Sequence, residues 1–218
     1  MKVKVCGITR PEDVKLMESS KADLIGFIHI HRSARFVSLD EICKLTSSMK
    51  NKDKAVLVME TEDINEVENA VEKTGINMVQ FHSLSSRDIE KFKVSHPSFK
   101  IIRSIGISPN FSPSKVDEIR NYALTCDFLL FDFEMDGKSG GTGKQIPLKD
   151  AVKAAKIARK YNSKVKLFLA GGINTTRIKN EGKTLKNVFD YVDVNSGVEE
   201  EPGIKKEDKI KEFMQVME

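Results

Sequence analysis

The hydrophobic and polar positions of the chain repeat one pattern: a short apolar run, a polar turn, then a longer segment with apolar residues at helical spacing. The apolar runs predict strands at residues 3–6, 23–30, 54–59, 77–82, 100–106, 127–133, 165–171 and 190–196. The longer segments carry apolar residues at i, i+3 and i+4, as in Ile64, Val67, Ala70 and Val71, which indicates amphipathic helices. These helices are predicted at residues 12–20, 39–49, 63–73, 86–92, 113–124, 148–161, 175–182 and 205–217.

Strands that alternate with helices predict an α/β fold with a parallel sheet and right-handed crossovers. Eight such units in 218 residues fit one closed (β/α)₈ TIM barrel, and no linker or charge block interrupts residues 1–218, so a single domain is expected. The rival is an open doubly wound sheet. It usually carries a glycine-rich fingerprint after its first strand, and here only Gly7 follows.

Composition and charge narrow the classes of function. The chain has 39% hydrophobic and 31% charged residues, which is typical of a soluble globular protein. Its 36 basic and 32 acidic residues are interspersed and give a net charge of +4, which disfavours a nucleic-acid-binding surface. The mild basic excess suits an anionic substrate.

Cysteine usage and the lack of long apolar stretches bear on location. Cys6, Cys43 and Cys126 are odd in number and far apart, which argues against a disulfide framework or a zinc ribbon and favours a reducing compartment. The chain opens without an apolar signal region, and no stretch approaches the roughly 20 apolar residues of a membrane helix. We therefore expect a cytoplasmic protein without membrane contact.

Chemistry in this barrel collects at the carboxyl ends of the strands, where the chain has Cys6 and Asp132. Asp132 follows an apolar run, so burial should raise its pKa and keep it protonated as an acid, whereas Asp127 lies at the opposite, stability-serving end. A thiol at Cys6 acts as a base or nucleophile only when its pKa is lowered. The alternatives are a loop or cap aspartate and a small buried hydrophobe, the role expected for Cys43 and Cys126.

Two glycine turns follow the last two predicted strands. Gly171 and Gly172 precede Asn174, a good helix N-cap, and Ser196 and Gly197 follow the next strand in the same way. The loops after strands seven and eight are the usual phosphate site of this barrel, and free N–H groups at a helix start bind anions. The two turns therefore predict phosphate binding, with plain turn glycines as the alternative.

The segment DGKSGGTGKQ at 136–145 is similar to a P-loop but fails as one. Five residues rather than four separate Gly137 from Gly143, and Gln145 stands where Ser or Thr would hold Mg²⁺. Its glycines indicate a loop that can close over a substrate, or else a simple surface loop. The glycines of this candidate lid are Gly140, Gly141 and Gly143.

Two arginines also follow or lie within predicted strands. Arg35 is a candidate clamp for a carboxylate, because its guanidinium group binds carboxylates bidentately, and the alternative is a solvated loop arginine. Arg103 is expected either at the barrel mouth or in its wall.

A resemblance to a known family rests on six segments in family order: CGITR at 6–10, GFIHIHRSARFVS at 26–38, VQFHS at 79–83, GGTGK at 140–144, LAGGIN at 169–174 and DVNSGVEEEPGIK at 193–205. Together they closely resemble phosphoribosylanthranilate isomerase, the Amadori-type isomerase of tryptophan biosynthesis. The resemblance implies a barrel without metal or cofactor that acts on a small phosphorylated substrate.

The resemblance also implies roles for single residues. Cys6 matches the general base and Asp132 the general acid. Arg35 matches the residue that holds the anthranilate carboxylate, Asp193 lies near the ribose hydroxyls, and His82 belongs to the strand-four motif of the substrate site. The turns that match the phosphate site are those at Gly171, Gly172, Ser196 and Gly197.

The chain departs from the family pattern at the pocket rim and the lid. Ile30 and His31 replace an aromatic–Pro pair, and Ser83 replaces a glycine. Residues 145–147 replace a Phe-Asp-Trp segment. These changes touch neither Cys6 nor Asp132.

Three other functions stay open on sequence grounds. His29 and His31 fall on one face of a strand end, as in a metal-dependent hydrolase, although further histidine ligands are missing from the later strands. Another sugar-phosphate isomerase would use paired aspartates in place of the cysteine. A phosphate-binding barrel without catalysis is the third. Both a monomer and a homodimer are compatible with the family.

Overall fold

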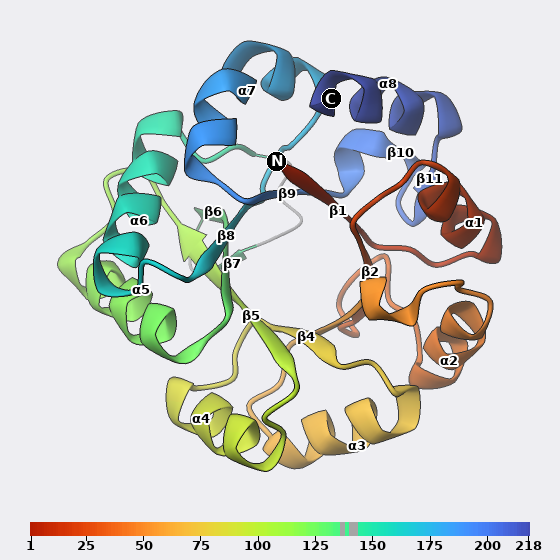
Figure 1. The fold of residues 1–218 in the computed structure, drawn as a ribbon, viewed down its shortest axis with the longest axis horizontal. Helices are drawn as coiled ribbons and strands as arrows, with labels where there is room; N and C mark the ends of the chain where they lie inside the picture. Colours follow the sequence, from red (N-terminus) through yellow and green to blue (C-terminus); the bar gives the residue numbers. More distant parts are fainter. Residues whose placement is uncertain (136–137, 140–143) are drawn as a thin grey trace.

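Parallel strands of the described residues close into a barrel surrounded by helices (Figure 1). The computed structural model describes residues 1–135, 138–139 and 144–218. The barrel strands are β1 (Lys2–Cys6), β2 (Leu24–His29), β3 (Ala55–Met59), β4 (Met78–Phe81), β5 (Lys100–Ile107), β6 (Phe128–Met135), β8 (Lys166–Leu169) and β9 (Tyr191–Val194). Each strand pairs in parallel with the next, and β9 pairs with β1, so the sheet of these strands has no free edge. The predicted (β/α)₈ barrel is confirmed.

The helices follow the strands in chain order and form the outer layer (Figure 1). They are α1 (Pro11–Ser19), α2 (Leu39–Ser47), α3 (Ile64–Thr74), α4 (Ser86–Ser95), α5 (Pro113–Thr125), α6 (Leu148–Tyr161), α7 (Thr175–Val188) and α8 (Glu207–Met217), with short 3₁₀ turns η1 (Lys52–Lys54) and η2 (Ser196–Val198). Polar caps begin several of them, and Asn174 begins α7 by accepting a hydrogen bond of 2.8 Å from the N–H of Arg177. Within the described parts of the chain, we find no helix with the length and apolar character needed to cross a bilayer.

Side chains alternate along each strand between two separate layers. On β1, Val3 and Val5 belong to the core between barrel and helices, whereas Lys4 and Cys6 face the barrel interior. The interior layer is apolar at most positions and includes Leu24, Val56, Val58, Ile102, Leu130 and Phe168. These interior side chains fill the barrel below the carboxyl ends of the strands, so a binding site can form only above them.

The structure departs from the predicted elements mainly near the C-terminus. Helix α7 continues to Val188, beyond the predicted end at residue 182, because Gly182 is buried within the helix and Leu185 extends its core face. An antiparallel hairpin, β10 (Glu199–Glu201) and β11 (Ile204–Lys205), follows η2. Helix α8 therefore begins later than predicted. A further short strand, β7 (Lys138–Ser139), pairs antiparallel with the end of β6.

Candidate active site

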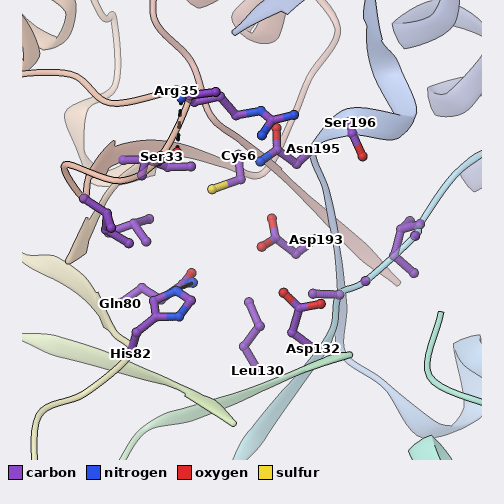
Figure 2. Close-up of a pocket in the computed structure, with 18 of the residues that line it drawn as sticks. Cys6, Ser33, Arg35, Gln80, His82, Leu130, Asp132, Asp193, Asn195 and Ser196 are labelled. Carbon is purple, nitrogen blue, oxygen red and sulfur yellow. Dashed lines mark hydrogen bonds between the residues drawn. The ribbon is translucent and has the colours of Figure 1, made fainter. Parts of the chain in front are cut away.

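A cavity of about 450 Å³ opens at the carboxyl ends of the barrel strands (Figure 2). Its wall comes from β1, β2, β3, β4, β6 and β9 and from the loops after β2, β4, β8 and β9. Of the residues singled out in the sequence, the wall contains Cys6, Arg35, His82, Asp132, Gly171, Gly172, Asp193 and Ser196. Gly197 is not part of the wall, and the proposed lid glycines Gly140, Gly141 and Gly143 lie outside the described residues.

Two glycines shape the surroundings of the Cys6 thiol in the cavity wall. Gly7 has a φ of +76°, which turns the chain sharply after β1, and a Cβ there would lie 2.7 Å from both Arg35 and Asn195. On the neighbouring strand, a Cβ at Gly26 would lie 2.7 Å from the Cys6 sulfur. The thiol therefore occupies the space of the missing side chain at Gly26.

Cys6 is a neutral thiol in this structure, whereas a general base has to be a thiolate. Burial raises the pKa of Cys6, and the positive charges of Lys4 and Lys205 offset this only in part, while the charge of Asp193 adds to it. The thiol form therefore dominates at neutral pH in this structure. Further positive charge in the cavity is needed to favour the thiolate.

Asp132 meets the expectation for a carboxyl group with a raised pKa. Burial raises the pKa of Asp132 to about 6, although the N–H of Phe133 donates to its Oδ1 at 2.7 Å and opposes the change. The charge of Asp193 raises the pKa of Asp132 further, and that of Lys4 lowers it. Asp132 is thus an acid that can hold or release its proton near neutral pH.

A buried ion pair lies next to these two groups. The ammonium group of Lys4 donates to Asp193 Oδ2 at 3.0 Å, and the parallel register of β1 and β9 sets the two residues side by side. Burial raises the pKa of Asp193, and Lys4 opposes this. Sequence reasoning found Asp193 and missed Lys4, although Lys4 stands two positions before Cys6 and so had to share its face of the strand.

Arg35 lines the cavity but already has a carboxylate partner. Its Nε lies 2.9 Å from Glu199 Oε1, and its Nη2 donates to Glu199 Oε2. The ammonium group of Lys205 donates to the same Glu199 at 2.8 Å and to Asn195 Oδ1 at 2.9 Å. The interpretation of Arg35 as a free bidentate clamp is therefore incomplete, because the edge formed by Nε and Nη2 is occupied. Sequence reasoning missed both Glu199 and Lys205, which stand in charged stretches that are typical of surface loops.

Strand β4 brings two polar side chains to the cavity wall, Gln80 and His82 (Figure 2). Burial lowers the pKa of His82 to about 4, so its ring is neutral at physiological pH. Gln80 Nε2 lies 3.1 Å from His82 Nε2, and since an amide nitrogen can only donate, the ring carries its proton on Nδ1. His82 Nδ1 and Gln80 Oε1 are buried without a hydrogen-bond partner in the described structure.

The two glycine turns lie near each other on the cavity rim, in keeping with the predicted pairing. Gly171 and Gly172 lead into α7, and the buried Arg177 fixes this turn by donating to the carbonyl of Gly171 at 3.0 Å and to that of Ile146 at 2.7 Å. Ser196 begins the 3₁₀ turn η2 in the wall. Gly197 packs against the backbone of the other turn, because a Cβ added at Gly197 would lie 2.1 Å from the carbonyl oxygen of Ile173.

Other candidates from the sequence lie elsewhere. His29 contacts the carbonyl of Val37 through Nδ1, and His31 stacks on Phe36. Both histidines line a second cavity of about 290 Å³. Within the described ranges, no three His, Cys, Asp or Glu side chains are grouped to hold a metal ion. Arg103 points into the helix layer, where it donates to the carbonyl of Phe81 and lies over the Tyr122 ring, so it belongs to the barrel wall.

Comparisons with known proteins agree with one another. The family model described as N-(5'phosphoribosyl)anthranilate (PRA) isomerase matches residues 3–216. The N-(5'-phosphoribosyl)anthranilate isomerase of Methanothermobacter marburgensis is 35% identical over 220 residues, which cover 100% of this chain and 95% of that protein.

Two solved structures are similar in fold. Phosphoribosyl anthranilate isomerase from Thermotoga maritima has a TM-score of 0.80 at 24% identity, over 100% of this chain and 98% of that one. A phosphoribosyl anthranilate isomerase in complex with reduced 1-(o-carboxyphenylamino)-1-deoxyribulose 5-phosphate has a TM-score of 0.75 at 24% identity, with the same coverage. With the match of the family model over nearly all residues, the chain belongs to the N-(5'-phosphoribosyl)anthranilate isomerase family.

Proposed function

We propose that this protein converts N-(5'-phosphoribosyl)anthranilate into 1-(2-carboxyphenylamino)-1-deoxyribulose 5-phosphate, an Amadori rearrangement in tryptophan biosynthesis. Family membership supports the reaction class. The observation that carries the mechanism is the meeting of a thiol, Cys6, and a carboxyl group of raised pKa, Asp132, in the wall of one cavity. An isomerase that moves protons within one substrate needs such an acid and such a base.

Asp132 is the general acid in this proposal. Its proton goes to the ring oxygen of the ribose as the bond between that oxygen and C1 breaks, and the nitrogen lone pair forms the C1–N double bond of an iminium ion. A pKa of about 6 leaves a useful fraction of Asp132 protonated near neutral pH and lets the proton leave readily.

Cys6 is the general base. It removes the proton from C2, the C2–H electrons form a C1–C2 double bond, and the iminium electrons return to nitrogen. The resulting enolamine becomes the ketone when C1 takes up a proton and the C2 hydroxyl loses one, so that atoms and charge balance. The iminium ion supplies the positive charge that Cys6 lacks in this structure, because a cation beside a buried thiol stabilises its thiolate.

The remaining wall residues bind the substrate in this scheme. Arg35 takes the anthranilate carboxylate through the part of its guanidinium group that Glu199 leaves available. Asp193 and His82 are assigned to the sugar hydroxyls, because both side chains line the cavity and can form hydrogen bonds with hydroxyl groups. The phosphate is assigned to the two turns that contain Gly171, Gly172, Ser196 and Gly197.

The test is turnover by the wild-type protein in the presence of EDTA. Phosphoribosylanthranilate is added, and the fall of its anthranilate-type fluorescence is followed while the product, which has the same mass as the substrate, is identified by the ketone carbon signal in its ¹³C NMR spectrum. Turnover in EDTA with this product supports the proposal and excludes the rival metal-dependent hydrolase. An inert wild-type protein, or activity that returns only on adding a divalent metal, would refute it.

A further inference from the structure

Lys4 is a buried lysine that the scheme above does not use. It is fully buried, and it shares the inner face of β1 with Cys6, two positions further along the strand. The barrel interior is otherwise mostly apolar, with side chains such as Leu24, Val56 and Phe168. An apolar side chain of similar size would avoid the cost of burying an ammonium group at this place. A charge that is kept despite such a cost is typical of a functional site.

The contacts of Lys4 connect it to the cavity without placing it in the wall. Its Nζ lies 3.0 Å from Asp193 Oδ2, and both partners are nearly or fully buried. The second oxygen, Oδ1, is also buried and has no hydrogen-bond partner in the described part of the chain, while Asp193 lines the cavity between Cys6 and Asp132 (Figure 2). Lys4 thus fixes the position of a carboxylate that forms part of the cavity wall.

The charge of Lys4 acts on titratable groups from four strands or strand ends. Burial lowers the pKa of Lys4, but the nearby Asp193 and Cys6 outweigh burial and raise it, so the ammonium group stays charged. Lys4 is the largest influence that opposes burial at Cys6, acting through its charge and through a hydrogen bond. It opposes burial at Asp132 as well, and its charge disfavours protonation of His82.

We propose that Lys4 is a positioning residue of the acid–base site: its ammonium group holds the Asp193 carboxylate toward the cavity and favours the thiolate of Cys6. The catalytic meaning of this role rests on the proposed function, in which Cys6 is the base. Two further cations, Lys205 and Arg35, face Cys6 from the hairpin and from the loop after β2, and they share the carboxylate of Glu199. Lys4 is the cation that comes from the same strand as the thiol and lies beneath the cavity.

The test measures the ionisation of Cys6 directly and needs no substrate. Cys6 is alkylated with iodoacetamide over a range of pH, and the modified peptide is quantified by mass spectrometry in a Cys43→Ser background, which removes a partly exposed thiol. Lys4→Met should slow the alkylation of Cys6 at neutral pH about tenfold or more and move its midpoint to higher pH, because one pKa unit is a tenfold change in thiolate. The matched control, Lys2→Met on the same strand but at the surface, should change neither.

A second pair of variants covers the case in which Lys4→Met folds poorly because it leaves Asp193 buried without a partner. Asp193→Asn removes the negative charge and should speed the alkylation of Cys6 relative to the wild type. Adding Lys4→Met to Asp193→Asn should then slow it about tenfold or more relative to that single variant. Circular dichroism establishes that each variant is folded.

Catalysis gives the second readout. In Lys4→Met, the acidic limb of the kcat profile should move to higher pH, because removing this charge raises the pKa of both Cys6 and Asp132, whereas a purely structural role would lower kcat by the same factor at every pH. Unchanged alkylation rates and midpoints on removal of Lys4, in both backgrounds, overturn the proposal even when the enzyme is active. A slowed alkylation together with an inert wild-type protein would instead support the effect of Lys4 on Cys6 and refute the proposed function.

Discussion

Replacing Gly26 with alanine should displace the Cys6 thiol while the barrel stays folded. The added Cβ would lie 2.7 Å from the Cys6 sulfur and 3.2 Å from the Cys6 Cα. Favourable non-bonded contacts of this kind lie at roughly 3.5–4.0 Å, so the sulfur has to move by about 1 Å. It can do so because it is the terminal atom of its side chain and borders the cavity.

The expected losses follow from this displacement. Moving a reacting group by about 1 Å can cost about 10²-fold in rate, which corresponds to about 2.7 kcal/mol of transition-state stabilisation. Overpacking of a core typically costs about 1–3 kcal/mol of folding free energy. The stability cost of Gly26→Ala should lie at the lower end of that range, because the thiol can rotate into the cavity. Activity should therefore suffer more than stability.

The assay pairs kcat/KM from substrate fluorescence with urea unfolding. Combining Gly26→Ala with Cys6→Ala provides the control, since alanine lacks the sulfur, which is the nearest of the three Cys6 atoms that the new Cβ would meet. The stability cost of Gly26→Ala should largely vanish in that background. A Gly26→Ala enzyme with the kcat/KM of the wild type would refute the reasoning, and an equal stability loss in both backgrounds would show that the clash is not with the thiol.

Three further predictions concern charge. First, kcat/KM should fall about tenfold per pH unit below about pH 6, given the pKa of about 6 at Asp132 and the raised pKa of Cys6. In that range, the fraction of enzyme with both a protonated Asp132 and an ionised Cys6 decreases. A flat profile down to about pH 4 would contradict the assignment. Asp132→Asn should stabilise the fold by up to about 3 kcal/mol in urea unfolding above about pH 6, where the folded protein holds a desolvated carboxylate. This gain should disappear as the pH falls toward about 4 and the unfolded chain also becomes protonated; a gain that does not depend on pH would argue against a raised pKa. Glu199→Gln should raise KM about tenfold with less effect on kcat, because Arg35 loses its charged anchor, and an unchanged KM would separate Arg35 from substrate binding.

The sequence predicted the barrel well because its signals are local. Each predicted strand matches the observed one to within about two residues, since short apolar runs between polar turns mark buried parallel strands. Helix α7 ran past its predicted end because burial of Gly182 decides that the helix continues, and burial is a tertiary property. The hairpin of β10 and β11 is too short to show any period.

The candidate site could be predicted only where strand ends define it. Cys6 and Asp132 follow from the rule that chemistry collects at the carboxyl ends of barrel strands. Lys4 was within reach of the same argument, because residues two apart on a strand share a face. Glu199 was not, since its partner Arg35 lies 164 positions away in the chain and nothing local distinguishes this glutamate from its exposed neighbours.

The most direct test of the account is the turnover of phosphoribosylanthranilate in EDTA by Cys6→Ser and Asp132→Asn, each beside a matched control. Cys43→Ser removes a thiol that does not line the cavity, and Asp127→Asn changes an aspartate at the opposite end of the β6 region. Both site variants should lose about 10²-fold or more in kcat/KM, while the folded controls should stay within a few fold of the wild type. Full activity in either Cys6→Ser or Asp132→Asn would contradict the assigned acid–base pair.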